Sequence, residues 1–388
     1  MTLNLPGDEV GRTQRPSDSA YVDVNHMEGL TIVTESDVQG ATPRVPFPGI
    51  SPRAYEHPAD KGAMATLRTV PGVGNVLKTL NSLFNERAER LVAVASNVRV
   101  GPAQYPVLDR LRNESAEILD LPRVPKLYVT RDPRAVAQTR GIDEPFIVLS
   151  TGLVEALDTE ALRFVIGHEM GHVLSGHAVL LTLLDRLLRL QRSVAWMPLG
   201  VIGLRAVIAA LHEWQRKSEL SCDRAGLLAG QDPRAALRAH LYLAGATDTA
   251  QIDIPSFLEQ AKEYEDVDDI RDSVIKLLAV ESQPHPFAVV RASQLQRWAA
   301  SEEYRAILAG EYKRRDGEDE RSPLNEDVKG AAKSYKDAWN NSTDPLVKVF
   351  SDVGGALSGA ADRVFGGFRR SGQQETPDSD NAGGGNGS

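Results

Sequence analysis

The chain has little cysteine and no excess of positive charge, and these shortages exclude several classes of protein. Among 388 residues there is one cysteine, Cys222, so an intrachain disulfide and a cysteine-rich metal site are both excluded. The formal net charge is −9, and no basic patch with interleaved aromatic residues occurs, which argues against a nucleic-acid-binding protein. The hydrophobic content of 41% is still sufficient for the core of one large domain or two smaller ones.

The chain also lacks a long uninterrupted apolar run. Its first 38 residues contain none, which predicts that there is no secretory signal. The most apolar region, 178–211, is broken by Asp185, Arg186 and Arg189 and falls short of the ~20 apolar residues that span a bilayer. We interpret this region as a buried helical hairpin, and the alternative is peripheral association with a membrane. The expected location is cytoplasmic, with or without such association.

Composition and periodicity divide the chain into five parts. The parts are a flexible N-terminal tail (1–45), a helical region packed on the core (46–120), the core itself (121–310), a charged linker with amphipathic helices (311–370) and a disordered tail (371–388). Within the fourth part, 345–368 carries a weak apolar stripe. That stripe makes it a second candidate for a membrane-surface helix, while a helix packed on the domain is the alternative.

The most informative stretch is His168-Glu-Met-Gly-His172, in a helix-patterned segment that begins near Thr159 with Asp158 or Thr159 as its N-cap. Histidines four residues apart lie one above the other on a helix, so both imidazoles can bind one zinc ion. Glu169 is turned by about 100° from His168. It can therefore contact a metal-activated water as a general base without being a ligand.

Two glycines in this helix, Gly167 and Gly171, are poor helix formers. Their presence is explained if a ligand, a metal or a second backbone must come close to the helix. The alternative interpretation of the whole motif is a buried helix with two histidines that serve only its packing.

A catalytic zinc site usually has a third protein ligand. His177 points about 180° away from His168 on a continuous helix, so it is interpreted as a polar position near the helix end. The stronger candidate is Glu219, which lies four residues before Asp223 on a second helix-patterned stretch. Asp223 would then accept a hydrogen bond from a liganding histidine. The alternative is a solvated helix face, but the apolar residues that follow indicate burial.

These residues resemble the M48 family of zinc metallopeptidases, which are gluzincins and include the membrane-associated heat-shock protease and the CAAX-prenyl protease type. The resemblance covers roughly residues 120–298. It implies a mainly helical α+β fold with a zincin-like core and a small β-sheet, and one Zn²⁺ per chain bound by His168, His172 and Glu219. Family members usually have hydrophobic helices ahead of the motif, and the sequence shows none there.

The resemblance also implies roles for residues outside the metal motif. His285, in a His-Pro element, would stabilise the oxyanion of the reaction, with a histidine in a proline-flanked turn as the alternative. Arg291 would orient substrate or pair with a carboxylate, or it is a plain surface arginine. Residues 146–153 resemble the active-site edge strand of the family and the turn that follows it, with 146–149 as the strand. Phe146, Ile147 and Val148 are thus expected to bind an extended peptide by strand addition, although two core strands at 126–130 and 146–149 would explain the same pattern.

The predicted function is zinc-dependent endopeptidase activity on extended or unfolded protein segments, with Glu169 as the general base. The alternative from another class is a non-catalytic, zinc-stabilised module that binds peptides at a membrane surface. A deformylase-type hydrolase would need a cysteine ligand upstream of the helix, whereas Cys222 lies downstream.

Overall fold

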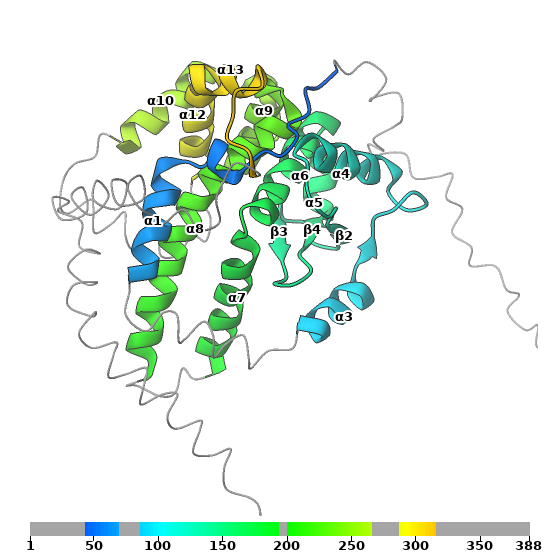
Figure 1. Cartoon of the computed structure of the whole chain (residues 1–388), viewed down its shortest axis with the longest axis vertical. Coiled ribbons are helices and arrows are strands. Elements are labelled where there is room, and N and C mark those ends of the chain that lie inside the picture. Colours follow the sequence, from blue (N-terminus) through cyan, green and yellow to red (C-terminus); the bar gives the residue numbers. More distant parts are fainter. Residues whose placement is uncertain (1–42, 70–85, 194–199, 266–286, 316–388) are drawn as a thin grey trace, which may run out of the picture. The chain divides into compact units, whose positions relative to one another are not determined.

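The computed structural model describes residues 43–69, 86–193, 200–265 and 287–315. These residues form a mainly helical α+β fold with one small sheet (Figure 1), which confirms the predicted fold class. The α-helices are α1 (Pro58–Thr69), α3 (Glu86–Ser96), α4 (Pro106–Ile118), α5 (Thr151–Ala156), α6 (Thr159–Leu174), α7 (His177–Ser193), α8 (Gly200–Gly230), α9 (Pro233–Ala244), α10 (Ile254–Glu265), α12 (Ala288–Ala299) and α13 (Glu302–Leu308). Two short 3₁₀ helices are η3 (Pro52–Ala54) and η4 (Thr249–Gln251).

The sheet has four strands in the order β1-β2-β4-β3, namely β1 (Val98–Arg99), β2 (Lys126–Thr130), β4 (Phe146–Ser150) and β3 (Ala137–Arg140). Strands β2 and β4 are parallel, and both outer pairs are antiparallel. Alternate residues of a strand point to opposite faces. Leu127 and Ile147 therefore enter the main core with α6, while Tyr128 and Phe146 face the other side and pack on α3.

Helices α6 and α8 approach each other very closely, and glycines make the approach possible. A Cβ atom added to Gly167 would lie 2.4 Å from the Cβ of Ala229, and one added to Gly171 would lie 2.7 Å from the Cβ of Ala225. On α8, a Cβ at Gly226 would lie 2.7 Å from the carbonyl oxygen of Phe164. Of the three explanations that the sequence left open for the two glycines of the histidine motif, the close approach of a second backbone is the one found.

The hairpin predicted within 178–211 is found in the described residues as α7 packed against α8 (Figure 1). Leu187 and Leu211 are buried in the cluster between the two helices, beside Trp214. Arg186, one of the charged residues that interrupt this apolar region, is buried within the protein. Its guanidinium is fully buried and forms two hydrogen bonds with Glu89 of α3, at 3.1 and 2.9 Å. Among the described residues, no helix has both the length and the apolarity needed to cross a membrane.

Helix α1 is anchored to α8 by a buried polar contact. The hydroxyl of Ser221 donates a hydrogen bond to Asp60 (2.6 Å), and it accepts one from the backbone N–H of His57 (2.9 Å). Burial raises the pKa of Asp60 to about 7, and the hydrogen bond from Ser221 only partly opposes this shift. The contact fixes α1 against the turn of α8 that also carries Glu219.

Several predictions fall outside the described residues. They concern both tails (1–42 and 316–388, which include 345–368) and the region 266–286. The division of the chain into five parts remains a prediction. Within the region 46–120, which we expected to be mostly helical, the structure also has the two-residue strand β1.

We predict that Gly171→Ala destabilises the protein by roughly 1–3 kcal/mol, because the new methyl group forces α6 and α8 apart. Ala225→Gly, introduced together with Gly171→Ala, should recover much of this loss, since it removes the atom that the methyl group meets. Urea unfolding of the parent, the single variant and the double variant measures the effect. Equal stability of Gly171→Ala and the parent would show that the helix contact is not this tight.

We predict that Asp60→Asn becomes more stable relative to the parent as the pH rises. A carboxyl group whose pKa is raised from 3.8 to about 7 by folding contributes stability below pH 3.8 that is lost as the pH rises through 7. Asparagine keeps the acceptor for Ser221 and has no such titration. Urea unfolding of both proteins at about pH 5 and about pH 8 tests this. A difference in unfolding free energy that does not change with pH would contradict it.

Candidate active site

The two histidines of the motif occupy one buried face of α6. The helix begins where the sequence predicts, because Asp158 caps it by accepting hydrogen bonds from the backbone N–H groups of Glu160 and Ala161. The rings of His168 and His172 lie edge to face, with 5.0 Å between their centroids. Both Nε2 atoms face the same carboxylate, that of Glu219 on α8.

The spacing of these three side chains matches a tetrahedral zinc site. Nε2 of His168 lies 3.4 Å from Oε2 of Glu219, and Nε2 of His172 lies 3.4 Å from Oε1 of the same residue. Donor atoms bound about 2.1 Å from a tetrahedral zinc ion lie about 3.4 Å apart. All three side chains are buried. Two imidazoles and one carboxylate are also a ligand set that zinc accepts while keeping a fourth position for solvent or substrate.

Asp223, one turn after Glu219, lies on the far side of the His168 ring. The Nδ1–H group of His168 donates a hydrogen bond to Oδ1 of Asp223 at 2.9 Å, which leaves Nε2 as the free donor atom toward the metal position. Burial alone would lower the pKa of His168. The hydrogen bonds with Asp223 and Glu219 outweigh burial and raise this pKa to about 9. The carboxylates therefore favour a positive charge at the centre of the site.

Arg291 enters the site from α12 and contacts both carboxylates of α8. Its Nε and Nη2 atoms donate to Asp223 at 2.8 and 2.6 Å, and Nη1 lies 3.1 Å from Oε2 of Glu219. Asp223 is fully buried, which by itself raises its pKa. The guanidinium of Arg291 reverses this and holds the pKa well below its usual range.

Among the alternatives for Arg291, pairing with a carboxylate is the one found. The arginine is buried, so the interpretation as a surface residue is wrong. Its guanidinium contacts Asp223 and Glu219. It fixes the two carboxylates relative to His168.

Glu169 is held by a residue that the sequence analysis missed. The buried hydroxyl of Thr139, on β3, lies 2.7 Å from Oε2 of Glu169 and 3.0 Å from its carbonyl oxygen. The hydroxyl donates its proton to these acceptors, and no described residue hydrogen-bonds to the other carboxylate oxygen, Oε1. Thr139 was missed because β3 has the sequence Ala-Gln-Thr-Arg, which lacks the alternating apolar pattern that identifies a strand.

The prediction that residues 146–149 form the edge strand is wrong. Strand β4 is an inner strand, because β2 pairs with one of its sides and β3 with the other. Its backbone is therefore not available for strand addition at Phe146, Ile147 or Val148, and the interpretation as a core strand applies. The edge next to α6 is β3, which carries Thr139.

His285 lies outside the described residues.

His177 does not extend α6, because that helix ends at Leu174 and the chain turns at Gly176, whose φ is +71°. A new helix starts at His177, and its ring lies 5.5 Å from that of His172, centroid to centroid.

A second group of possible metal ligands, His172, His177 and Cys222, therefore shares one histidine with the first. Nδ1 of His177 lies 3.5 Å from the sulfur of Cys222. Burial raises the pKa of this thiol well above its usual value. Because zinc binds the thiolate, binding to this group would have to displace the proton of a buried thiol. The group that contains Glu219 is thus the better zinc site.

Comparison with known proteins agrees with this geometry. The sequence model of peptidase family M48 matches residues 102–299. This chain belongs to peptidase family M48. Over 278 residues it is 33% identical to the Plastoglobule-localized metallopeptidase 48, chloroplastic, of Arabidopsis thaliana, an alignment that covers 69% of this chain and 78% of that protein. Membership in M48 makes the protein a metalloprotease and implies a metal cofactor and protein or peptide substrates.

Other M48 relatives match over shorter regions. A Protease HtpX homolog of Caldanaerobacter subterraneus subsp. tengcongensis is 33% identical over 105 residues, which are 26% of this chain and 35% of that protein. The Protease HtpX homolog of Bacillus pumilus is 26% identical over 116 residues, 28% of this chain and 38% of that protein. The chain thus spans little more than a third of these two relatives. No solved structure matches the chain.

We predict that Thr139→Val lowers kcat by about tenfold or more and leaves KM and zinc content unchanged. Valine has the same shape but no donor, and a hydrogen bond to a charged group is worth about 1.5–3 kcal/mol. Thr139→Ser keeps the hydroxyl and should retain most of the activity. Thr130→Val, at the end of β2, is the matched control. Equal kcat values for Thr139→Val and Thr130→Val would show that the hydroxyl does not position Glu169.

Proposed function

We propose that the protein is a zinc-dependent endopeptidase with one zinc ion per chain, bound by His168, His172 and Glu219. The observation that carries this proposal is the spacing of 3.4 Å between each histidine nitrogen and the carboxylate, next to a glutamate that Thr139 holds in place. A structural zinc site has no need for Glu169, whereas hydrolysis needs a base at this position.

Each residue of the site has a distinct task in this proposal. Zinc in such a site would acidify water and polarise a carbonyl group. Asp223 keeps the proton of His168 on Nδ1, and Arg291 keeps Asp223 and Glu219 in their orientations. With Oε2 held by Thr139, Oε1 of Glu169 takes the proton of the attacking water and later passes it to the leaving amine.

The substrate would be an extended segment of a protein. On the side away from β4, the backbone of β3 pairs with no strand in the described parts of the chain, and this strand is in contact with the helix that carries Glu169. A peptide added to this edge would form backbone hydrogen bonds with little dependence on its sequence. The role of His285 as oxyanion donor remains part of the proposal, as does a cytoplasmic location.

Association with a membrane through 178–211 or 345–368 remains a prediction. In the first region, the buried leucines of α7 and α8 pack against each other, so they offer no apolar surface to a bilayer. The second region lies outside the described residues.

We predict that Glu169→Gln keeps one zinc ion per chain and loses casein cleavage by about 10²-fold or more, because glutamine cannot accept a proton. Glu219→Ala should lower the zinc content, because it removes one of three protein ligands. Zinc analysis by atomic absorption and casein cleavage are measured for each protein. Glu155→Gln, an exposed position on α5, is the control and should match the parent in both.

Zinc loss from Glu169→Gln, or cleavage that survives this change, would contradict the role of Glu169 as base. Unchanged zinc in Glu219→Ala would remove Glu219 from the ligand set. One zinc ion in the parent with no cleavage of casein or of unfolded proteins would favour the peptide-binding module over the peptidase.

A further inference from the structure

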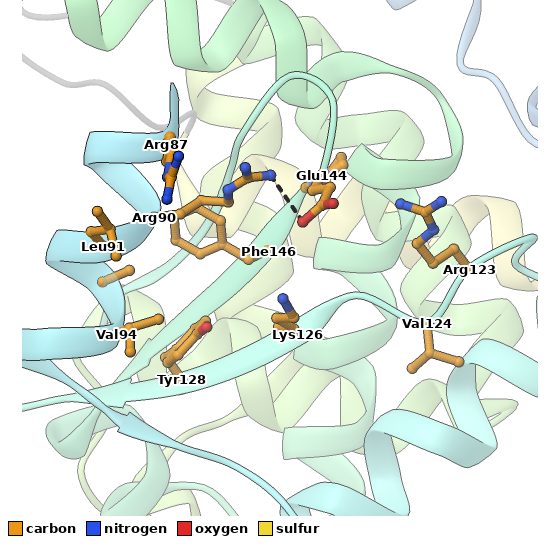
Figure 2. Close-up of a pocket in the computed structure, with 12 residues that line it drawn as sticks. Arg87, Arg90, Leu91, Val94, Arg123, Val124, Lys126, Tyr128, Glu144 and Phe146 are labelled. Carbon is orange, nitrogen blue, oxygen red and sulfur yellow. Dashed lines mark ion pairs between the residues drawn. The ribbon is translucent and has the colours of Figure 1, made fainter. Parts of the chain in front are cut away.

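A pocket lies on the face of the sheet that points away from α6. Lys126, Tyr128 and Phe146 line it from β2 and β4, and α3 covers one side (Figure 2). Its volume is about 290 Å³. The floor is aromatic, since the rings of Tyr128 and Phe146 meet edge to face with 5.8 Å between their centroids. Adjacent residues of the same strands, Leu127 and Ile147, point into the core toward α6. The pocket is therefore separated from the candidate active site by the thickness of the sheet.

The charge of this pocket is opposite to that of the whole chain. Four cationic side chains line it, from Arg87, Arg90, Arg123 and Lys126, whereas Glu144 is the one acidic residue in the lining. Arg90 pairs with Glu144 at 2.9 Å, and the dashed line in Figure 2 marks this ion pair. Arg123 and Lys126 form no ion pair within the described parts of the chain, and both are exposed. Two uncompensated cations thus stand at the mouth of the pocket.

Exposed apolar side chains gather around the same pocket. Leu91 and Val94 of α3 are 59% and 52% exposed, and Val124 is 43% exposed; all three line the pocket. Single exposed apolar residues are common on protein surfaces, but a contiguous group of them marks a binding surface.

The wall that carries these residues is fixed by the fold. Glu86, at the start of α3, accepts hydrogen bonds from the backbone N–H groups of Ile142, Asp143 and Glu144 in the loop between β3 and β4. Ala93 packs on Tyr128 and Phe146. The pocket is thus preformed, which lowers the entropic cost of binding a ligand.

We propose that this pocket binds an amphipathic anion, namely an acyl chain that ends in a carboxylate or a phosphate. The acyl chain of the ligand would lie against Phe146, Tyr128, Leu91 and Val94. Its anionic group would lie between Arg123 and Lys126. A volume near the lower limit for ligand sites accommodates a single chain. The ligand is either a free fatty acid or a lipid that stays in a membrane, and both offer the same chemistry. Binding does not depend on the proposed peptidase activity.

The test titrates the full-length protein with sodium decanoate in a calorimeter. We expect one decanoate per chain, and at least tenfold weaker binding of decanol, which lacks the charge. Arg123→Gln combined with Lys126→Gln should weaken decanoate binding by about tenfold or more. Val94→Trp should block it by filling the pocket. The matched control is Arg131→Gln combined with Lys262→Gln, which removes the same charge from two exposed positions outside the pocket.

A second arm distinguishes the two sources of the ligand. The same proteins are floated with phosphatidylcholine vesicles that contain or lack phosphatidylglycerol. Binding of decanoate without flotation would assign the pocket to a free fatty acid. Flotation that needs phosphatidylglycerol and is lost in the Arg123/Lys126 variant would assign it to a membrane lipid. The proposal is overturned if neither probe binds, or if the pocket variants bind both probes as well as the control variant does.

Discussion

The close contact between α6 and α8 is the constraint on which the rest of the structure depends. Gly167, Gly171 and Gly226 leave no room for a side chain where the helices meet. A wider helix separation would move Glu219 out of reach of the two histidines. It would also break the hydrogen bond between His168 and Asp223, which crosses the same interface. The glycines lower the intrinsic stability of the helices, and in return the proposed metal ligands of two helices meet at one point.

Electrostatics imposes a second condition on the same interface. Glu169, Glu219 and Asp223 bring three carboxylates into a buried site, and Arg291 is the guanidinium that contacts two of them. With neutral histidines the site keeps two uncompensated negative charges, which a divalent cation would neutralise. Buried charges are costly unless they are paired, so the donor set and the net charge both fit a zinc ion.

Much of this site could be predicted from the sequence because its residues lie at helical spacings. His168 and His172, and then Glu219 and Asp223, are each separated by four residues, so the local periodicity alone places each pair on one face. The glycines also indicated a close contact. The pairing of the two helices through Gly226 was beyond this reasoning, because it depends on residues that are distant in the chain.

The predictions from the sequence that were wrong or incomplete also have physical reasons. Residues 146–149 are apolar without alternation, which is typical of an inner strand that is covered on both faces. This pattern favoured the interpretation as a core strand over the interpretation as an edge strand. The real edge, β3, is short and polar, so its strand and Thr139 had no pattern by which to be found. His177 was placed on a continuous helix, whereas Gly176 turns the chain and returns the ring to His172. The pairing of Arg291 with two carboxylates on another helix has no local signature at all.

The central claim is that zinc is bound by His168, His172 and Glu219 and not by the neighbouring group that contains Cys222. Zinc K-edge X-ray absorption of the zinc-loaded, full-length protein tests it most directly. The account predicts that the first coordination shell contains only nitrogen and oxygen atoms, at about 2.0–2.1 Å from the zinc ion. The spectrum should also show the multiple-scattering signal of two imidazole rings. A sulfur neighbour at about 2.3 Å would contradict it and would assign the metal to Cys222.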